Sequence, residues 1–356
     1  MTDANYSQDD EELLNFIESA KPKIYVVGAG GSGSNTITRM AELNIEGAKL
    51  IAANTDAPHL ARTKATRKIL LGKKLTRGLG AGSDPHLGEE AAMESKEDIS
   101  HIVSDAQLVF ITCGMGGGTG TGSCSVIAQQ AKDAGALTIA IVTLPFSSEG
   151  KSRMKNALEG LAKLKRIADT VIIIPNDKLL SVAPDLPLNM AFRVSDEILA
   201  NATKGIIEMV TKAGMVNLDF ADLRSVIKNS GYAVIGIGEA NSAQSSNRAS
   251  IAIENTLKSP LLDVDLSTAK KALVNIVGGD DLTLKEAQTI FQQVADRISE
   301  DALLKWGARI EPTMQKSSVK VMVVLGGVEF QDYNDMFLTK KFQDGEDIDL
   351  DQIFED

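Results

Sequence analysis

The sequence is poor in the residues that build metal centres, disulfide frameworks and membrane spans. Its 356 residues include two cysteines and three histidines, and no His/Cys cluster has the spacing of a zinc site. The longest apolar runs, 171–174 and 321–325, are far below the ~20 residues that cross a bilayer. The first twenty residues lack the basic start and apolar stretch of a signal peptide. We therefore expect a cytoplasmic protein, with no metal site built from its own side chains.

Acidic residues are in excess, giving a net charge of −11, but they are concentrated at the two ends. Residues 1–20 contain six acidic residues and no lysine or arginine, and residues 331–356 contain nine acidic residues and two lysines. Removing both ends from the totals of 48 and 37 leaves 33 acidic and 35 basic residues in 21–330. A nearly neutral centre argues against a broad nucleic-acid-binding surface. We expect an acidic N-terminal extension at 1–20 and an acidic mobile tail at 331–356.

In the first half of the chain, short β-branched runs alternate with helical patterns. We expect strands at 23–27, 50–53, 106–112, 137–143 and 170–174. Helical patterns start at Asn35 and cover 121–134 and 151–168. Strands that alternate with helices form a parallel sheet covered on both faces. The first half is therefore predicted to be an α/β domain.

A long helix follows, and the pattern changes after it. Apolar residues recur at helical spacing over 188–212, a helix of ~33 Å at 1.5 Å per residue, and the pattern ends before Gly214. Beyond it, strands are expected at 233–237, 272–277 and 319–325, around helices at 248–257 and 284–298. We divide the chain into a first domain at 21–213, which includes the long helix, and a smaller α+β domain at 214–330.

The first informative glycine segment spans residues 28–35, after the first predicted strand. Gly28, Gly30 and Gly33 satisfy G-x-G-x-x-G, and Asp56 follows the next strand. Glycines let a backbone approach a phosphate, and a helix N-terminus supplies free N–H groups. From these residues alone, a dinucleotide-binding Rossmann domain and a tight turn without a ligand both remain open.

The second glycine segment, residues 114–122, decides between these interpretations. Six of its nine residues are glycine, which costs several kcal/mol of backbone entropy at roughly 0.5–1 kcal/mol each. Consecutive N–H groups in such a loop form a cradle for an anion, and threonine hydroxyls add donors. A Rossmann cofactor site needs no second loop of this kind, and a simple turn needs one or two glycines. The segment predicts a phosphate site.

These segments resemble the tubulin/FtsZ family of polymerising GTPases. Gly-Gly-Gly-Thr-Gly-Thr-Gly at 116–122 is similar to the family's signature loop, and Asn-Leu-Asp-Phe-Ala-Asp at 217–222 to its synergy loop. Segments 54–56, 75–82 and 175–180 resemble the FtsZ branch rather than tubulin, and Ser32 and Ser34 in place of glycines fit an archaeal branch. The resemblance covers 21–330. It implies a Rossmann-like GTP-binding domain, a long central helix and a smaller α+β domain.

The resemblance also assigns a GTP and GDP site, with Mg²⁺ bound through the phosphates. Glu149 and Arg153 match positions near the ribose and phosphates, although the residues alone allow a surface ion pair. Phe192 and Asp196 match the residues that stack on guanine and accept its hydrogen bonds, although Phe192 alone could be core packing. The implied phosphate-binding residues are Gly30, Gly31, Ser32, Gly33, Ser34, Asn35, Gly117, Gly118, Thr119 and Gly120.

Three polar residues after the long helix are implied to be catalytic. Asn217, Asp219 and Asp222 match the synergy loop, although the spacing of the two acids also suits helix capping. Because the long helix separates them from the glycine segments, one chain cannot bring its acids to its own phosphates. The expected enzyme is a GTPase that forms head-to-tail filaments and whose active site is completed by the adjacent subunit.

The implied role is in the division ring, in the cytoplasm at mid-cell. The acidic tail intersperses apolar residues among its acids, which suits either docking to a division adaptor or membrane-anchor protein, or simple solubilisation. No nucleic acid and no direct membrane insertion are expected. Two other functions remain open: an NAD-binding oxidoreductase built on the first glycine segment, and an FtsZ/tubulin relative that acts in cell shape.

Overall fold

The structure is a computed structural model, which describes residues 21–180, 187–241, 247–262 and 264–328. The acidic extension and the acidic tail lie outside the described residues, so what we expect of them stays a prediction. The strands are β1 (Ile24–Ala29), β2 (Ala48–Asn54), β3 (Arg67–Leu70), β4 (Leu108–Gly114), β5 (Leu137–Leu144), β6 (Thr170–Pro175), β7 (Gly231–Asn241), β8 (Lys271–Gly278), β9 (Leu303–Ile310) and β10 (Ser318–Gly326). The helices are α2 (Gly30–Glu42), α3 (Ala57–Arg62), α4 (Pro85–Glu94), α5 (Lys96–Val103), α6 (Gly118–Asp133), α7 (Lys151–Ile167), α8 (Asn176–Leu180), α9 (Leu188–Thr211), α10 (Phe220–Ile227), α11 (Arg248–Leu257) and α12 (Leu284–Ala295).

The described strands form one sheet of ten, in the order β3-β2-β1-β4-β5-β6-β7-β10-β8-β9. From β3 to β6 every pairing is parallel, which confirms the α/β prediction for the first half. The second half contains antiparallel pairings of β10 with β7 and β8. The two halves share a continuous sheet because 170–172 of β6 pair with 231–233 of β7. This join was not predicted, since pairing between distant strands leaves no local pattern in the sequence.

Two strands, β3 and β9, were missed because both are edge strands with weak periodicity. β3 is four residues long and starts with two exposed basic residues. β9 carries a lysine, an arginine and Gly307, and only three of its residues are buried. Edge strands bury less surface than central strands, so their sequences are less constrained. The predicted helix at 284–298 is also shorter than expected, because α12 ends at Ala295.

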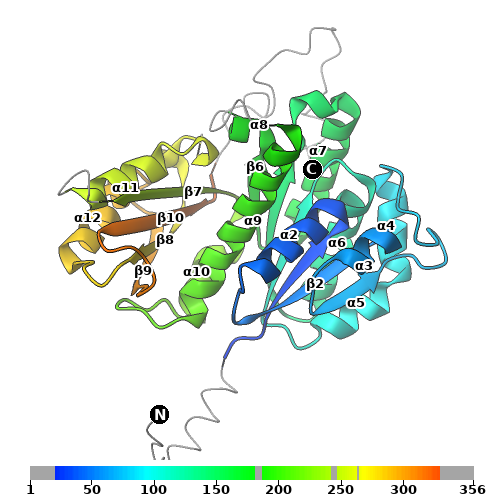
Figure 1. The fold of residues 1–356 in the computed structure, drawn as a ribbon, viewed down its shortest axis with the longest axis horizontal. Helices are drawn as coiled ribbons and strands as arrows, with labels where there is room; N and C mark the ends of the chain where they lie inside the picture. Colours follow the sequence, from blue (N-terminus) through cyan, green and yellow to red (C-terminus); the bar gives the residue numbers. More distant parts are fainter. Residues whose placement is uncertain (1–20, 181–186, 242–246, 263, 329–356) are drawn as a thin grey trace, which may run out of the picture.

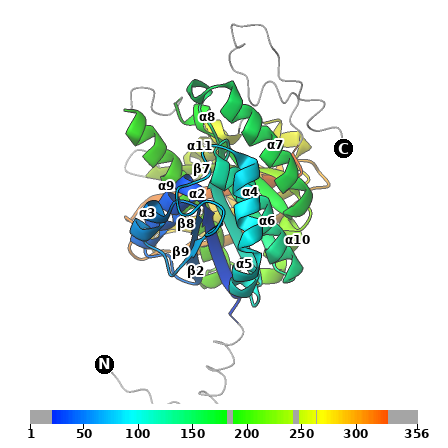
Figure 2. The same ribbon diagram turned by 90° about the vertical axis from the view of Figure 1, so that its right-hand side faces the viewer.

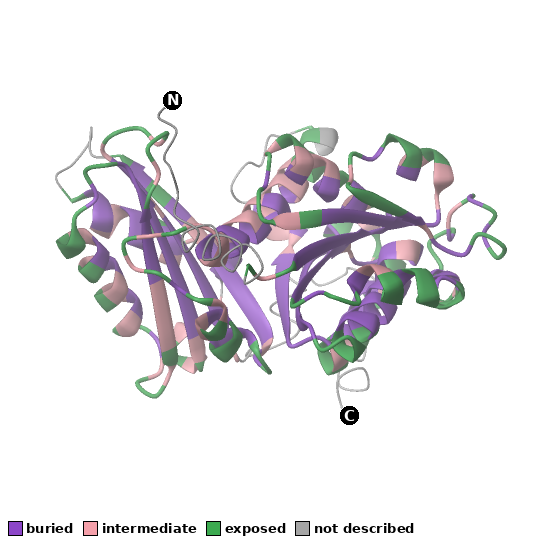
Figure 3. Ribbon diagram, turned by 90° about the horizontal axis from the view of Figure 1, so that it is seen from below, coloured by how far each residue is buried: buried purple, intermediate pink, exposed green. Residues whose placement is uncertain are grey.

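Helices cover both faces of the parallel part of the sheet (Figure 1). α4, α5, α6 and α7 share one apolar core with one face, and α4 packs along α6 (Figure 2). α2, α3, α9 and α10 share a second core with the other face. Figure 3 shows most of the strand residues buried, with exposed and intermediate positions on the edge strands and on the outer sides of the helices. No helix among the described residues is long and apolar enough to cross a membrane.

The long helix α9 connects the two halves and packs against both. Its buried side chains, among them Leu199 and Ile206, belong to the same core as residues of β5 and of β10. With 24 residues, α9 is about 36 Å long. Figure 1 shows α8 near the upper end of α9 and α10 at its lower end.

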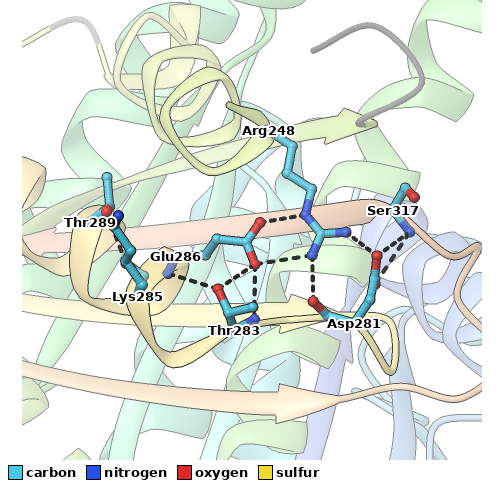
Figure 4. A network of polar contacts seen from close by, with 7 residues as sticks. All are labelled: Arg248, Asp281, Thr283, Lys285, Glu286, Thr289 and Ser317. Carbon is cyan, nitrogen blue, oxygen red and sulfur yellow. Dashed lines mark hydrogen bonds and ion pairs between the residues drawn. The ribbon is translucent and has the colours of Figure 1, made fainter. Parts of the chain in front are cut away.

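An ion-pair network around the buried Arg248 fixes the outer helices of the second half (Figure 4). Arg248, the first residue of α11, is 5% exposed and pairs with Glu286 of α12 at 2.6 Å and with Asp281 at 2.8 Å. Glu286 also accepts from the Thr283 hydroxyl in the capping box of α12. Asp281 accepts from the backbone N–H of Ser317, just before β10. The buried guanidinium of Arg248 is therefore paired and hydrogen-bonded, as a buried charge must be.

Candidate functional site

The carboxyl ends of β1, β4, β5 and β6 surround one cavity of about 550 Å³. Open α/β sheets bind ligands at this edge, where loops leave the strands for the helices. Most of the predicted nucleotide-binding residues line the cavity. They are Gly31, Ser32, Asn35, Gly117, Gly118, Thr119, Gly120, Glu149, Arg153, Phe192 and Asp196.

The first glycine segment forms the opening turn of α2 rather than a loop ahead of the helix. α2 begins at Gly30, so the expected start at Asn35 is wrong. Gly30 has a φ of +71°, which glycine adopts without strain. A Cβ on Gly28 would lie 2.2 Å from the carbonyl oxygen of Gly33, so this close approach of strand and helix requires glycine. Gly30, Gly33 and Ser34 are buried and do not line the cavity.

The second glycine segment divides its residues between the cavity and helix packing. Gly117 is the N-cap of α6, and a Cβ there would meet nothing within 4 Å. A Cβ on Gly122 would lie 2.1 Å from the carbonyl oxygen of Pro85, and one on Gly118 would lie 2.8 Å from Asp84 N. Close packing of α6 on α4 therefore accounts for part of the glycine excess. The first turn of α6 still leaves backbone N–H groups without helical partners at the cavity wall.

The N-terminal part of α9 supplies an aromatic ring and a carboxylate to the cavity. Phe192 is 39% exposed, and its ring meets that of Phe146 edge-on, with centroids 5.2 Å apart. It therefore packs against a neighbour and still faces the cavity. Asp196 Oδ1 accepts hydrogen bonds from Ser32 Oγ and Thr36 Oγ1, each at 3.3 Å. Burial outweighs these bonds and raises the pKa of Asp196 to about 6.

Glu149 and Arg153 form an ion pair at the cavity wall, the contact that their spacing alone allowed. The Glu149 side chain is only 14% exposed, and its Oε1 accepts from the backbone N–H of Phe146 at 2.9 Å. The Arg153 side chain is 46% exposed. A fixed carboxylate beside a more exposed guanidinium is therefore available to a ligand's hydroxyl and phosphate groups.

Sequence reasoning missed a further wall of the cavity, formed after β2 and by the loop at 80–83. Asp56 lines the cavity and is the N-cap of α3, where its Oδ1 accepts from His59 N at 2.8 Å. His59 Nε2 lies 3.0 Å from Asn35 Oδ1. The sequence feature that could have indicated this wall is the position of 54–56 directly after a predicted strand, because ligands bind at the carboxyl ends of parallel strands.

Asn217, Asp219 and Asp222 do not line this cavity and lie beyond the other end of α9. Asp219 caps α10 by accepting from Asp222 N at 2.7 Å, so the capping interpretation is geometrically correct. Asn217 Oδ1 accepts from Gly214 N at 2.6 Å. Asp222 Oδ1 pairs with Lys305 Nζ at 2.7 Å, and this bond lowers the pKa of Asp222. Among the described residues, no three His, Cys, Asp or Glu side chains gather as a metal-binding group.

The cavity lies at the carboxyl edge of a parallel sheet and is lined by glycines, an aromatic ring, a carboxylate and a helix N-terminus. This arrangement is typical of a nucleotide-binding α/β protein. Comparison with known families agrees. Residues 23–184 match the tubulin/FtsZ family GTPase domain, and residues 231–329 match the FtsZ family C-terminal domain. Together these matches cover most of the chain.

Individual relatives give the same result. Cell division protein FtsZ 1 of Methanocaldococcus jannaschii is 52% identical over 336 residues, 94% of this chain and 91% of that protein. Cell division protein FtsZ 1 of Pyrococcus abyssi is 55% identical over 322 residues, 90% of this chain and 85% of that protein. A solved FtsZ dimer of M. jannaschii has a TM-score of 0.85 at 53% identity, covering 90% of this chain and 93% of that one.

The chain belongs to the FtsZ family, within the tubulin/FtsZ GTPases. This confirms the family resemblance, and the relatives above are archaeal, as the serines in the first glycine segment predicted. The protein is a cytoskeletal GTPase of cell division. The alternatives of an NAD-binding oxidoreductase and of a cell-shape protein are not supported, because the high identity is to FtsZ over nearly the whole length.

Proposed function

We propose that this chain binds GTP in the cavity and hydrolyses it only when a second copy completes the site. The phosphates lie on the first turns of α2 and α6, against Gly31 and 117–120. Glu149 and Arg153 contact the ribose and phosphates, and Phe192 and Asp196 hold the guanine. The proposal is supported by the convergence of these side chains on one cavity and by the GTPase family of the chain.

The separation of the two sets of residues along α9 carries this proposal. Phe192 and Asp196 lie in the first turns of the helix, whereas Asp219 and Asp222 follow its last turn. From Asp196 to Thr211 the helix rises about 22 Å. A straight helix of this length keeps the acids that follow it away from the cavity of the same chain. The acids of one chain are therefore available only to the cavity of another chain.

In the assembled state, the second copy presents Asn217, Asp219 and Asp222 to the phosphates. A carboxylate at that position orients and polarises the attacking water, and the amide of Asn217 fixes the segment through its bond to Gly214. When bound with the nucleotide, Mg²⁺ would offset part of the negative charge of the phosphates. Arg153 and the N–H groups of α6 stabilise the charge that develops on the phosphoryl oxygens.

This geometry is heterologous, because a cavity at one end of the chain meets acids at the other end. Head-to-tail contacts that do not close produce open filaments. The M. jannaschii relative is solved as a dimer, which fits self-association. We place these filaments at the mid-cell division ring, and we assign contact with a division adaptor or membrane-anchor protein to the acidic tail at 331–356.

The test is a comparison of wild type with Asp222→Ala. Specific GTPase activity should rise steeply with protein concentration, and Asp222→Ala should bind GTP normally yet hydrolyse it about 10²–10⁴-fold more slowly. Glu97→Ala, which removes an exposed acid of α5, is the matched control and should behave as wild type. Full specific activity in dilute monomer, or in Asp222→Ala, would contradict the proposal.

A mixing experiment separates shared sites from independent ones. Asp222→Ala keeps the cavity and loses the acid, whereas Asp196→Asn keeps the acid and weakens the cavity. Each variant alone should be nearly inactive. Their mixture should regain activity, because an Asp222→Ala cavity can meet the intact acids of an Asp196→Asn chain. A mixture no more active than its components would show that each chain works alone.

A further inference from the structure

The segment that carries the two acids is docked on the edge strand β9. Val216 and Ala308 exchange both backbone N–H···O bonds at 3.1 Å. Leu218 is buried and packs so closely on Gly307 that a Cβ there would lie 3.0 Å from Leu218 Cδ1. The same strand provides Lys305, whose Nζ lies 2.7 Å from Asp222 Oδ1. The strand that supports the acids therefore also supplies their counter-charge.

We propose that Lys305 is a positioning residue of the shared GTPase site. It holds the Asp222 carboxylate in one orientation on β9, and it supplies the positive charge that lets this carboxylate approach the phosphates of a second copy in ionised form. This inference rests on the proposed function, in which the acids enter a neighbour's cavity.

Both oxygens of Asp222 are engaged in the free chain. Oδ1 accepts from Lys305, and Oδ2 takes the weaker bond from Asp219 N at 3.4 Å. The side chains of Asp222 and Lys305 are 30% and 37% exposed, so both remain open to a partner. Exposed ion pairs on mobile side chains contribute little, but both ends here are held by α10 and by β9.

Charge explains why a lysine is needed at this position. A carboxylate that meets a triphosphate experiences like charge, which raises its pKa and favours protonation. The bond to Lys305 acts in the opposite direction and lowers the pKa of Asp222. Asp219, the N-cap of the same helix, also lowers the pKa of Asp222 through hydrogen bonds, whereas Lys271 of β8 donates to the carbonyl oxygen of Lys228. Within the described residues, Lys305 is the cation bonded to Asp222.

The experiment compares Lys305→Met, Lys305→Gln and Lys305→Arg in full-length protein, at protein concentrations that give equal assembly by sedimentation. Lys305→Met and Lys305→Gln should lower kcat about 10- to 100-fold with KM nearly unchanged, because the loss falls on the chemical step. Lys305→Arg should restore most of the activity. Lys258→Met breaks a comparable exposed pair, with Glu254 at 3.3 Å, and should behave as wild type.

Two further readouts distinguish this role from a structural one. The acid limb of the kcat–pH profile should move to higher pH in Lys305→Met and Lys305→Gln, and stay in place in Lys305→Arg. Asp222→Ala combined with Lys305→Met should be no slower than Asp222→Ala alone, because Lys305 acts through Asp222. Thermal unfolding of each variant checks that the fold is intact.

The results that would overturn this inference differ from those that would overturn the shared site. Wild-type kcat in Lys305→Met and Lys305→Gln, or a lowered kcat with an unmoved acid limb, rejects the role of Lys305 and leaves the shared site standing. Wild-type turnover in Asp222→Ala rejects the shared site itself, and this inference with it. Additive losses in the double variant reject a path through Asp222.

Discussion

Asp196 and Asp222 lie at opposite ends of α9, and their surroundings shift their pKa values in opposite directions. Burial raises the pKa of Asp196 to about 6, although two hydroxyls donate to it. Asp222 is more exposed, and its bond to Lys305 lowers its pKa. A partly dehydrated carboxylate suits a preformed binding site, where it can accept hydrogen bonds from a ligand's N–H groups. An exposed, ion-paired carboxylate suits a surface that acts on another molecule.

The same contrast appears in how the two ends are built. The cavity end depends on close backbone contacts, such as those of Gly28 and Gly122, which leave no room for a side chain. The acid end depends on capping hydrogen bonds and an ion pair, which leave Asp219 exposed. Substitutions should therefore affect the stability of the cavity end strongly, and at the acid end should separate stability from activity.

The largest effect is expected where the cavity end is packed most tightly. Gly122→Ala places a Cβ 2.1 Å from the Pro85 carbonyl oxygen and should lower the free energy of unfolding by about 3 kcal/mol, because α6 and α4 must move apart. Gly117→Ala, in the same segment, meets nothing within 4 Å and should change it by less than about 1 kcal/mol. Chemical denaturation measures both. Equal losses would mean that the segment tolerates side chains uniformly.

This contrast also indicates what the sequence could reveal. Periodicity located the central strands and α9, because residues such as Leu199 and Ile206 must face a core. Periodicity could not distinguish glycines that line the cavity from glycines that pack against helices, because Gly117 and Gly122 are both glycines of the same segment with no local pattern that tells them apart. Lys305 was missed because its partner lies 83 residues earlier in the chain, so only the folded sheet brings the two together.

A smaller effect, about tenfold per pH unit, is expected in nucleotide affinity below pH 6. In the proposed site GTP uses ionised Asp196 as an acceptor, so binding below the pKa of about 6 should release a proton, and affinity should fall as the pH falls. The free energy of unfolding of the nucleotide-free protein should change with pH in the opposite direction. Protonated Asp196 stabilises the fold at low pH, and this contribution is lost as the pH rises through about 6. Calorimetric titration between pH 5 and 8, with denaturation at the same pH values, measures both.

Asp196→Asn provides the control for this pH dependence. Its affinity for GTP should be lower at every pH and should lack the step near pH 6, while titration of the GTP phosphates remains in both proteins. Glu197→Gln changes the next residue, which pairs with Arg39 at 3.0 Å and does not line the cavity, and should keep the step. The same step in Asp196→Asn as in wild type would assign it to another group.

The smallest effect on stability is expected at the acid end. Asp219→Ala removes the N-cap of α10 and should lower the free energy of unfolding by about 1 kcal/mol, whereas Asp219→Asn keeps a capping oxygen and should change it by a few tenths. Thr283→Ala removes the equivalent cap of α12 and should cost about as much as Asp219→Ala. GTPase activity decides the role of the carboxylate. If Asp219 only caps α10, both Asp219→Asn and Thr283→Ala keep full turnover. If the charge of Asp219 acts on a neighbour's GTP, Asp219→Asn loses turnover at nearly unchanged stability, whereas Thr283→Ala retains turnover.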